Sequence, residues 1–185
     1  MAGSLIKIDE FTVSSAVASV TIGGGSSGSS GLNTSIDSTY DVYMVQVKDV
    51  LPTTNNVKLT ARVTESGTPN TTANYDFANK VFKTFSAFDN DSATNQTAWE
   101  LTDQELGTGT QETGYGTIYI FNANNSGEYT FITNEMVCRD DNGNMFGNQG
   151  GGVFTSASTV DGIQFLMASG NIDTGSSFVL YGLKK

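Results

Sequence analysis

The sequence predicts an all-β protein, an antiparallel, jelly-roll-like β-sandwich of about ten strands with little or no helix. Three observations lead to this prediction. Short β-branched and aromatic runs recur along the whole chain, and residues of the turn-forming types Gly, Asn and Ser separate them. Only two prolines occur among 185 residues, against 21 glycines. The charged fraction of 15% is low, and Thr, Ser and Asn fill its place, which favours strands and turns over helices.

The clearest strand spans residues 57–64, where apolar and polar residues alternate. This period of two is typical of a strand with one buried and one solvated face. Residues 40–50 are β-branched and aromatic almost throughout and predict a second strong strand. The other runs of strand composition are residues 5–8, 11–22, 98–101, 117–121, 128–138 and 153–156.

Residues 75–88 allow two interpretations. Their aromatic residues favour a strand, but Tyr75, Phe77, Val81 and Phe85 also fit a loose helical stripe, so a helix remains the alternative here. The following residues, 89–96, are polar and are predicted to form a loop.

Two apolar runs near the C-terminus, residues 163–168 and 177–183, flank a polar connection that contains Gly170 and Gly175. We expect two antiparallel strands joined by a loop. Both faces of each run are apolar, which suits strands covered on one side by a second sheet and on the other by a loop or a neighbouring subunit.

A single domain, residues 1–185, accounts for the whole chain, since all-β domains of this size are common. Residues 23–31 read GGGSSGSSG and predict a flexible loop, because such a stretch cannot pack. The residues before it are too few to bury a core of their own. The N-terminal residues lack the basic and apolar regions of a signal peptide, so we expect synthesis in a cytoplasm.

The overall charge argues against two classes of partner. A formal net charge of −10 and a pI of about 4.2 disfavour electrostatic binding to nucleic acid and to anionic membranes. We therefore expect no nucleic acid partner and no membrane insertion. No run has the length of a membrane span.

The chain contains no histidine, the commonest general base and metal ligand, and one cysteine. Cys138 lies within a predicted strand and is interpreted as a small core residue rather than a nucleophile. The sequence therefore predicts no enzymatic activity of the Ser–His or Cys–His type.

Two groups of acidic residues are candidates for a metal site or a catalytic site. The run from Asp140 to Asn144 has oxygen ligands like a calcium loop, but Met145 occupies the glycine position and Gly151 the position of the closing glutamate. A plain turn is therefore preferred, with no metal and no cofactor. Carboxylates that could form a glycosidase pair, disfavoured as solvated loop residues, are Glu100, Asp103 and Glu105.

Aromatic side chains on a sandwich can stack on sugar rings, although most of them belong to the core. The candidates for contact with a glycan or a partner are Trp99, Tyr115, Tyr119 and Tyr181. They support an alternative function, a carbohydrate-binding β-sandwich module.

Four segments resemble small virion proteins of tailed bacteriophages of the marine type. They are Gly170-Asn171-Ile172 with Gly175 and Phe178-Val179-Leu180-Tyr181-Gly182-Leu183-Lys184; Leu5-Ile6-Lys7-Ile8-Asp9-Glu10; Ser38-Thr39-Tyr40-Asp41-Val42-Tyr43-Met44-Val45; and Ser66-Gly67-Thr68-Pro69-Asn70-Thr71-Thr72-Ala73-Asn74-Tyr75.

The resemblance implies a non-enzymatic β-sandwich displayed on the virion surface, as a head decoration protein, a fibre or a tail accessory protein. Its implied partners are other capsid or tail proteins and further copies of itself, with a trimer favoured. A contribution to adhesion on host-surface glycans is also implied.

Overall fold

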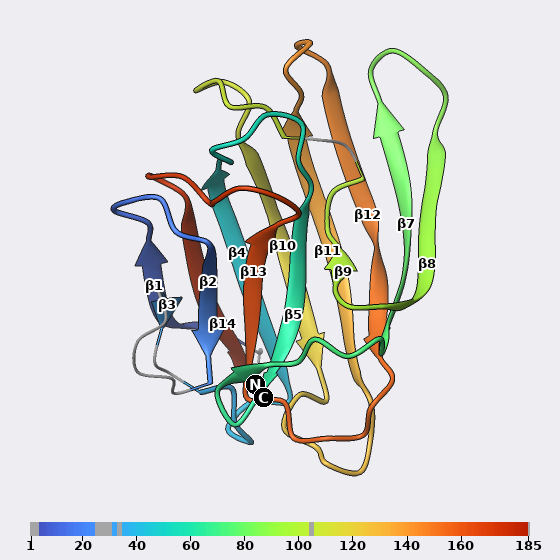
Figure 1. Ribbon diagram of the computed structural model, residues 1–185. Helices are drawn as coiled ribbons and strands as arrows, with labels where there is room; N and C mark the ends of the chain where they lie inside the picture. The colour runs from blue at the N-terminus through green and yellow to red at the C-terminus, as the bar shows by residue number, and fades with distance from the viewer. Residues whose placement is uncertain (1–3, 25–30, 33–34, 104–105, 185) are drawn as a thin grey trace.

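The computed structural model describes residues 4–24, 31–32, 35–103 and 106–184, and these residues form strands and turns without a helix. The predicted all-β sandwich is confirmed, because two sheets pack together around one hydrophobic core (Figure 1). The strands are β1 (Ser4–Thr12), β2 (Ser19–Gly23), β3 (Gly31–Leu32), β4 (Val42–Val50), β5 (Leu59–Glu65), β6 (Thr68–Pro69), β7 (Tyr75–Lys83), β8 (Asp89–Gln96), β9 (Trp99–Glu100), β10 (Gly114–Phe121), β11 (Thr130–Arg139), β12 (Met145–Phe154), β13 (Gly162–Met167) and β14 (Ser177–Lys184).

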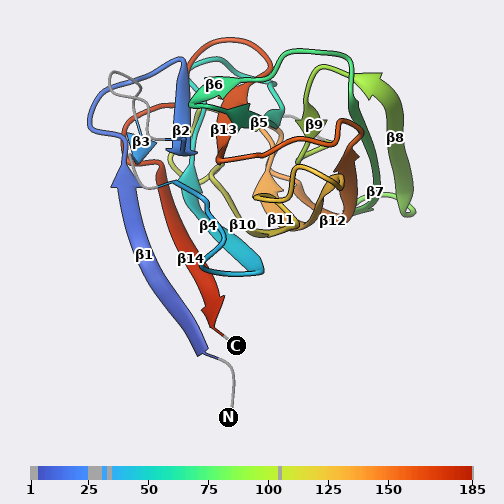
Figure 2. The same ribbon diagram turned by 90° about the horizontal axis from the view of Figure 1, so that it is seen from below.

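The larger sheet has eight strands in the order β1-β14-β4-β10-β11-β12-β7-β8. The smaller sheet has six strands, with β3-β2-β13-β5-β6 in line and β9 also paired to β5. Seen from below, the larger sheet curves around the smaller one, so one of its faces covers the core and the other faces outward (Figure 2). The pairs between neighbouring strands are antiparallel except for the short parallel contact of β2 with β3.

The C-terminal runs form the predicted strands, but the prediction that they pair with each other is wrong. Strand β13 lies between β2 and β5 in the smaller sheet, whereas β14 lies between β1 and β4 in the larger sheet. The two strands instead meet across the core, where the rings of Phe165 and Phe178 lie 4.9 Å apart. Runs that are apolar on both faces fit either arrangement, so residue type alone did not decide between them.

Other boundaries also differ from the predictions. Residues 75–83 form strand β7 rather than the alternative helix, and the polar residues 89–96 form its edge-strand partner β8 rather than a loop. The predicted strand 11–22 is interrupted, since β1 ends at Thr12 and β2 begins at Ser19. Most of the Gly/Ser segment, residues 25–30, lies outside the described residues, and its flexibility stays a prediction.

A pair of strands extends from the sandwich at one side. The start of β1 and the end of β14 run together beyond the neighbouring strands (Figure 2). Glu10 on β1 accepts hydrogen bonds from Lys7 and Lys48, each at 2.7 Å, and so ties β1 to β4 across β14. The hydrogen bond from Lys48, and to a smaller extent that from Lys7, lowers the pKa of Glu10 to about 2.

An aromatic cluster joins the sheets near β9. The ring centroid of Tyr75 on β7 lies 5.0 Å from that of Trp99 on β9 and 5.0 Å from that of Phe154 on β12, and all three side chains are fully buried. The Tyr75 hydroxyl accepts a hydrogen bond from the Val63 amide and donates one to the Asn70 carbonyl. This hydroxyl thus satisfies backbone groups of the opposite sheet, as buried polar groups require.

We expect Tyr75→Phe to lower the free energy of unfolding by about 1–3 kcal/mol, because it leaves buried backbone groups unpaired. Urea unfolding followed through the fluorescence of Trp99, the one tryptophan, measures this change. Tyr129→Phe is the control, since Tyr129 is 44% exposed and should leave stability nearly unchanged. Equal stability of the two variants would contradict the assigned role of the Tyr75 hydroxyl.

Candidate functional site

The outward face of the eight-stranded sheet carries the candidate site. Its strand β11 alternates strictly between buried and exposed residues along all ten positions. Ile132 and Met136 point into the core, whereas Phe131, Glu135 and Val137 point outward. The cross-strand register then fixes which side chains of neighbouring strands lie beside them on the outward face.

One row across this face is apolar on six successive strands. Phe131 pairs with Phe121 and Val153, Phe121 pairs with Val42, and Leu5 pairs with Leu183. Leu183 and Val42 are neighbours, because Leu183 follows Gly182 and Val42 precedes Tyr43 in the antiparallel pair Gly182–Tyr43. We call this row the apolar band; its members are Leu5, Leu183, Val42, Phe121, Phe131 and Val153.

The apolar band is accessible in the single chain. Leu5, Leu183 and Phe131 are each more than two-fifths exposed. With strands about 4.8 Å apart, six strands give the band a length of roughly 24 Å. A contiguous apolar strip of this kind is typical of a contact surface for another macromolecule.

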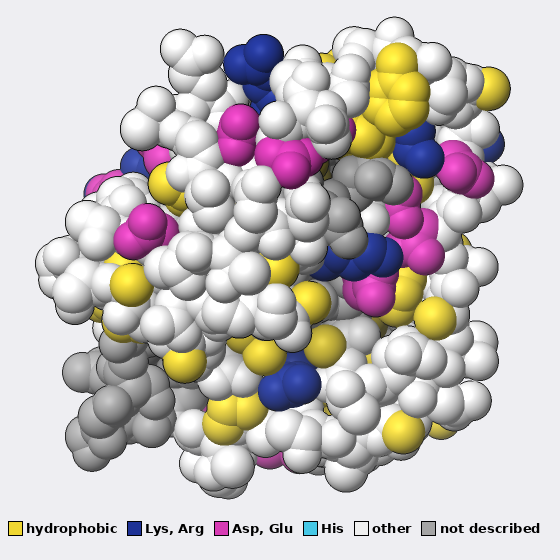
Figure 3. All heavy atoms as spheres, turned by 45° about the horizontal axis from the view of Figure 1, so that its top comes forward, with side chains coloured by type: hydrophobic (Ala, Val, Ile, Leu, Met, Phe, Trp, Pro, Cys, Tyr) yellow, Lys and Arg dark blue, Asp and Glu magenta, His cyan; other side chains and the backbone are white. Residues whose placement is uncertain are grey.

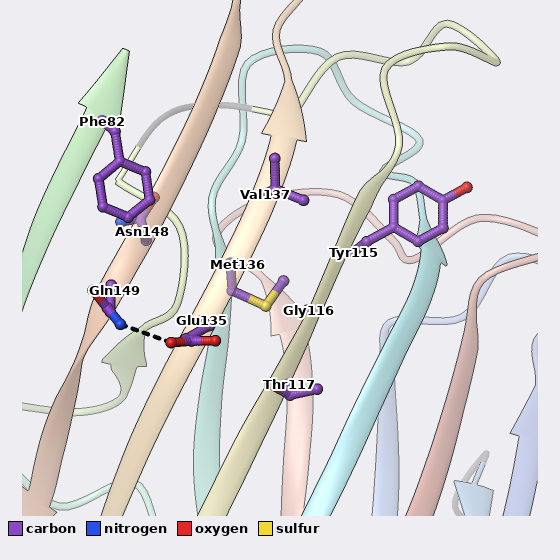
Figure 4. A pocket seen from close by; sticks show the side chains of 9 residues that line it. All are labelled: Phe82, Tyr115, Gly116, Thr117, Glu135, Met136, Val137, Asn148 and Gln149. Atoms are coloured by element: carbon purple, nitrogen blue, oxygen red, sulfur yellow. Dashed lines mark hydrogen bonds between the residues drawn. The ribbon is translucent and has the colours of Figure 1, made fainter.

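A second feature lies toward the other end of strands β10 and β11. It is an open depression of about 460 Å³, seen from close by in Figure 4. An adjoining depression of about 250 Å³ shares three of its lining side chains, Thr117, Glu135 and Gln149. We call the two depressions together the sheet groove.

Gly147 on β12 makes room for the Phe82 ring, which lines one end of the groove. A side chain at this position would clash with the ring of Phe82 on β7, which lies 2.4 Å from the place that a Cβ atom would occupy. Phe82 in turn packs edge-on against Phe88, with ring centroids 5.9 Å apart. Phe82 and Val137 thus form apolar parts of the groove wall (Figure 4).

Polar groups line the remainder of the groove. Gln149 donates a hydrogen bond of 2.7 Å from Nε2 to Oε1 of Glu135 on the neighbouring strand (Figure 4). On the far side the Tyr115 hydroxyl donates to Asp49, a residue in the left-handed region with φ of 53°. The register of β10 against β4 shifts beside Tyr115, and such bulges re-aim side chains. The Tyr115 ring accordingly points away from Phe82, over β4 (Figure 4).

The four aromatic residues proposed for glycan or partner contact differ in exposure and in position. Trp99 is fully buried and donates its indole N–H to the Val153 carbonyl, so it offers no surface for a ligand. Tyr115 and Tyr119 are 43% and 38% exposed, and both lie on β10 at the sheet groove. Tyr181 is half-buried on β14 and lies outside the groove.

Two of the carboxylates considered as a glycosidase pair form ion pairs with a lysine. Lys58 lies 2.6 Å from Glu100 and 3.8 Å from Asp103. Glu105 lies outside the described residues. The pKa of Asp91 on β8 is raised by burial and by the nearby charges of Glu100 and Asp103, against the opposing effect of Lys58.

The run from Asp140 to Asn144 forms the predicted turn. Burial alone would raise the pKa of Asp140, but hydrogen bonds from Asn144 and Asn142 lower it. Its carboxylate therefore serves the loop itself, accepting two backbone N–H groups and the Asn144 amide. In the described parts of the chain no three side chains of the metal-binding types gather in one place.

Cys138 occupies the core, as its place in a strand predicted. It is 3% exposed, and burial raises the pKa of its thiol to about 12. A thiol in this environment stays protonated and unreactive near neutral pH.

Comparisons of the chain with protein-family models, with curated proteins and with solved structures found no match. Over the residues that the structure describes, none of the secondary structure is a helix with the length and apolar character needed to cross a membrane.

We expect Asp91→Asn to stabilise the protein at pH 7, by less than about 1 kcal/mol because the site is partly exposed. The folded state raises the pKa of this acid, so ionisation costs stability above the folded-state pKa. The gain from Asn should disappear as the pH falls below the unfolded pKa of about 3.9, where the wild-type carboxyl is protonated too. Urea unfolding at pH 7 and about pH 3 measures both limits.

Asp89→Asn is the matched control on the same strand. The Asn90 amide and Lys83 lower the pKa of Asp89, so the sign should reverse, with lower stability at pH 7. A gain that is equal at both pH values in Asp91→Asn would contradict the electrostatic explanation.

Proposed function

We propose that this protein is a non-enzymatic structural protein of a phage virion, displayed on the particle surface. It acts as a head decoration protein, a fibre or a tail accessory protein and binds other virion proteins or further copies of itself. The observation that carries the proposal is the apolar band, which crosses six strands of the larger sheet and is exposed in the single chain.

The composition of the band supports contact with protein. Aromatic side chains are enriched and charged ones depleted at the centre of protein interfaces. In the band, Phe121 and Phe131 lie side by side between Val42 and Val153, and its members carry no charge. Burying these side chains against a partner removes apolar surface from water at about 25 cal/mol per Å².

Self-association is one form of this contact. The band ends on β1 and β14, whose projecting ends reach beyond the sheet and carry the exposed Leu5 and Leu183 (Figure 2). Two parts of one chain, the sheet and the projecting strands, can therefore contribute to one interface. A trimer, which the resemblance to phage virion proteins implies, would use the band in this way.

On another face of the molecule the charged side chains of both signs are interspersed. Acidic and basic side chains lie side by side in Figure 3 rather than in a patch of one sign. The net charge of −10 then favours solubility of the free chain before assembly. The proposal assigns no catalytic step to the protein.

We expect Phe131→Glu to reduce incorporation of the protein into particles strongly, because it places a charge in the middle of the band. The measurement is the copy number in purified virions of the encoding phage, by quantitative mass spectrometry against the major capsid protein. A copy number close to that of the capsid protein indicates a head decoration protein, and a far smaller one a tail or fibre protein.

The control is Phe88→Glu, which changes an aromatic residue that is 67% exposed outside the band. It should be incorporated like the wild type. Absence of the wild-type protein from the particle would refute the virion proposal, and equal incorporation of both variants would refute the role of the band.

A further inference from the structure

The centre of the sheet groove is a row of polar side chains in direct register. Thr117 on β10 pairs with Glu135 on β11, Glu135 pairs with Gln149 on β12, and Gln149 pairs with Lys80 on β7. Thr133 lines the same groove beside Tyr119, its cross-strand partner. The row places hydrogen-bonding groups of four strands along one line.

Two of these groups are already oriented. The hydrogen bond from Gln149 to Glu135 is the one that either side chain makes within the described residues. It uses one carboxylate oxygen and one amide N–H, so the second carboxylate oxygen and the amide oxygen remain as acceptors about one strand spacing apart. Side chains held in this way lose less conformational entropy when they bind a ligand.

Apolar surfaces flank the polar row. Phe82 and Val137 border it on one side, and the Phe82 ring lies over Gly147. Tyr119 borders it on the other side, two residues along β10 from Thr117 and on the same face. The groove therefore alternates apolar, polar and apolar along the direction of the strands.

We propose that the sheet groove is a binding site for a neutral glycan chain, with Glu135 and Gln149 accepting hydrogen bonds from sugar hydroxyls and Tyr119 and Phe82 contacting the C–H faces of the rings. The proposal deepens the proposed role on a virion surface by naming the ligand class of an adhesion site. It rests on the proposed function for its biological setting alone, because binding is a property of the purified chain.

The chemistry of the groove favours this ligand class over others. Adjacent acceptors suit the vicinal hydroxyl donors of sugars, and ring faces suit their apolar C–H surfaces. An apolar protein segment would bury the remaining acceptor oxygens of Glu135 and Gln149 without hydrogen-bond donors, which is costly. The Glu135 carboxylate and the net charge of −10 disfavour acidic glycans and nucleic acids.

The size of the groove agrees with a short stretch of polysaccharide. The larger depression alone, about 460 Å³, falls within the range of roughly 300–1,000 Å³ for ligand sites. The adjoining depression of about 250 Å³ extends it along the strands. Both are open to solvent at the sheet surface, so a chain can pass through without a free end.

Affinity gel electrophoresis of the purified protein tests the proposal. The gels contain dextran, laminarin or galactomannan as neutral polymers, and alginate as the acidic one. We expect at least one neutral polymer, and not alginate, to retard the wild-type protein. Gln149→Ala and Tyr119→Ala should each raise the dissociation constant obtained from the retardation about tenfold, the loss expected for one hydrogen bond or one aromatic contact.

Tyr129→Ala is the matched control, an exposed tyrosine outside the groove, and should be retarded like the wild type. Unchanged unfolding midpoints, read from Trp99 fluorescence, show that the variants are folded. Passage through all neutral gels without retardation, stronger retardation by alginate, or equal retardation of wild type and Gln149→Ala would overturn the proposal. Retardation by a neutral polymer together with absence of the chain from virions would refute the virion function and leave the glycan site standing.

Discussion

The contact between Phe165 and Phe178 holds the architecture together. The two rings lie 4.9 Å apart, are tilted by 31° and are fully buried. Phe165 sits on β13, the strand between β2 and β5, and Phe178 sits on β14, the strand between β1 and β4. One contact therefore connects the pairing of six strands, three in each sheet, to the packing of the sheets. Truncating a Phe in such a position costs about 3–5 kcal/mol, a large part of the stability of a domain.

The fold class could be predicted from the sequence, but the strand pairing could not. The alternation in residues 57–64 anticipates β5, but the face predicted to be solvated is mostly covered, because Thr60 and Thr64 are buried and Arg62 is half-buried. The C-terminal runs were placed in one hairpin because side-chain type reports burial and not the identity of the covering strand. The connection from Ala168 to Ser176 is long enough to cross between sheets about 10 Å apart, which allowed the other arrangement.

The strands that were missed have atypical composition for a physical reason. Strand β8 is an edge strand whose side chains are mostly exposed, so it needs no apolar residues to fill a core. Polar side chains at an edge also discourage pairing of the free strand edge with another chain. Strand β12 is rich in glycine because neighbours occupy the space of its side chains. Phe82 lies over Gly147, and the Trp99 ring lies 2.5 Å from the position of a Cβ atom on Gly152. A pattern based on β-branched residues cannot detect such a strand.

The candidate site was predictable only in part. The even spacing of Tyr115 and Tyr119, four residues apart in one strand, places them on one face, whereas the pairing of Glu135 with Gln149 requires the register of two strands. The same register separates the two features of the outward face. Phe131 of the apolar band and Glu135 of the groove are four residues apart on β11, or roughly 13 Å along the strand. A partner that covers the band from the side of β1 and β14 can therefore leave the groove open. The proposed attachment and the proposed glycan binding are compatible on one sheet, because strand alternation exposes both sets of side chains on the same face and their separation along the strand keeps them apart.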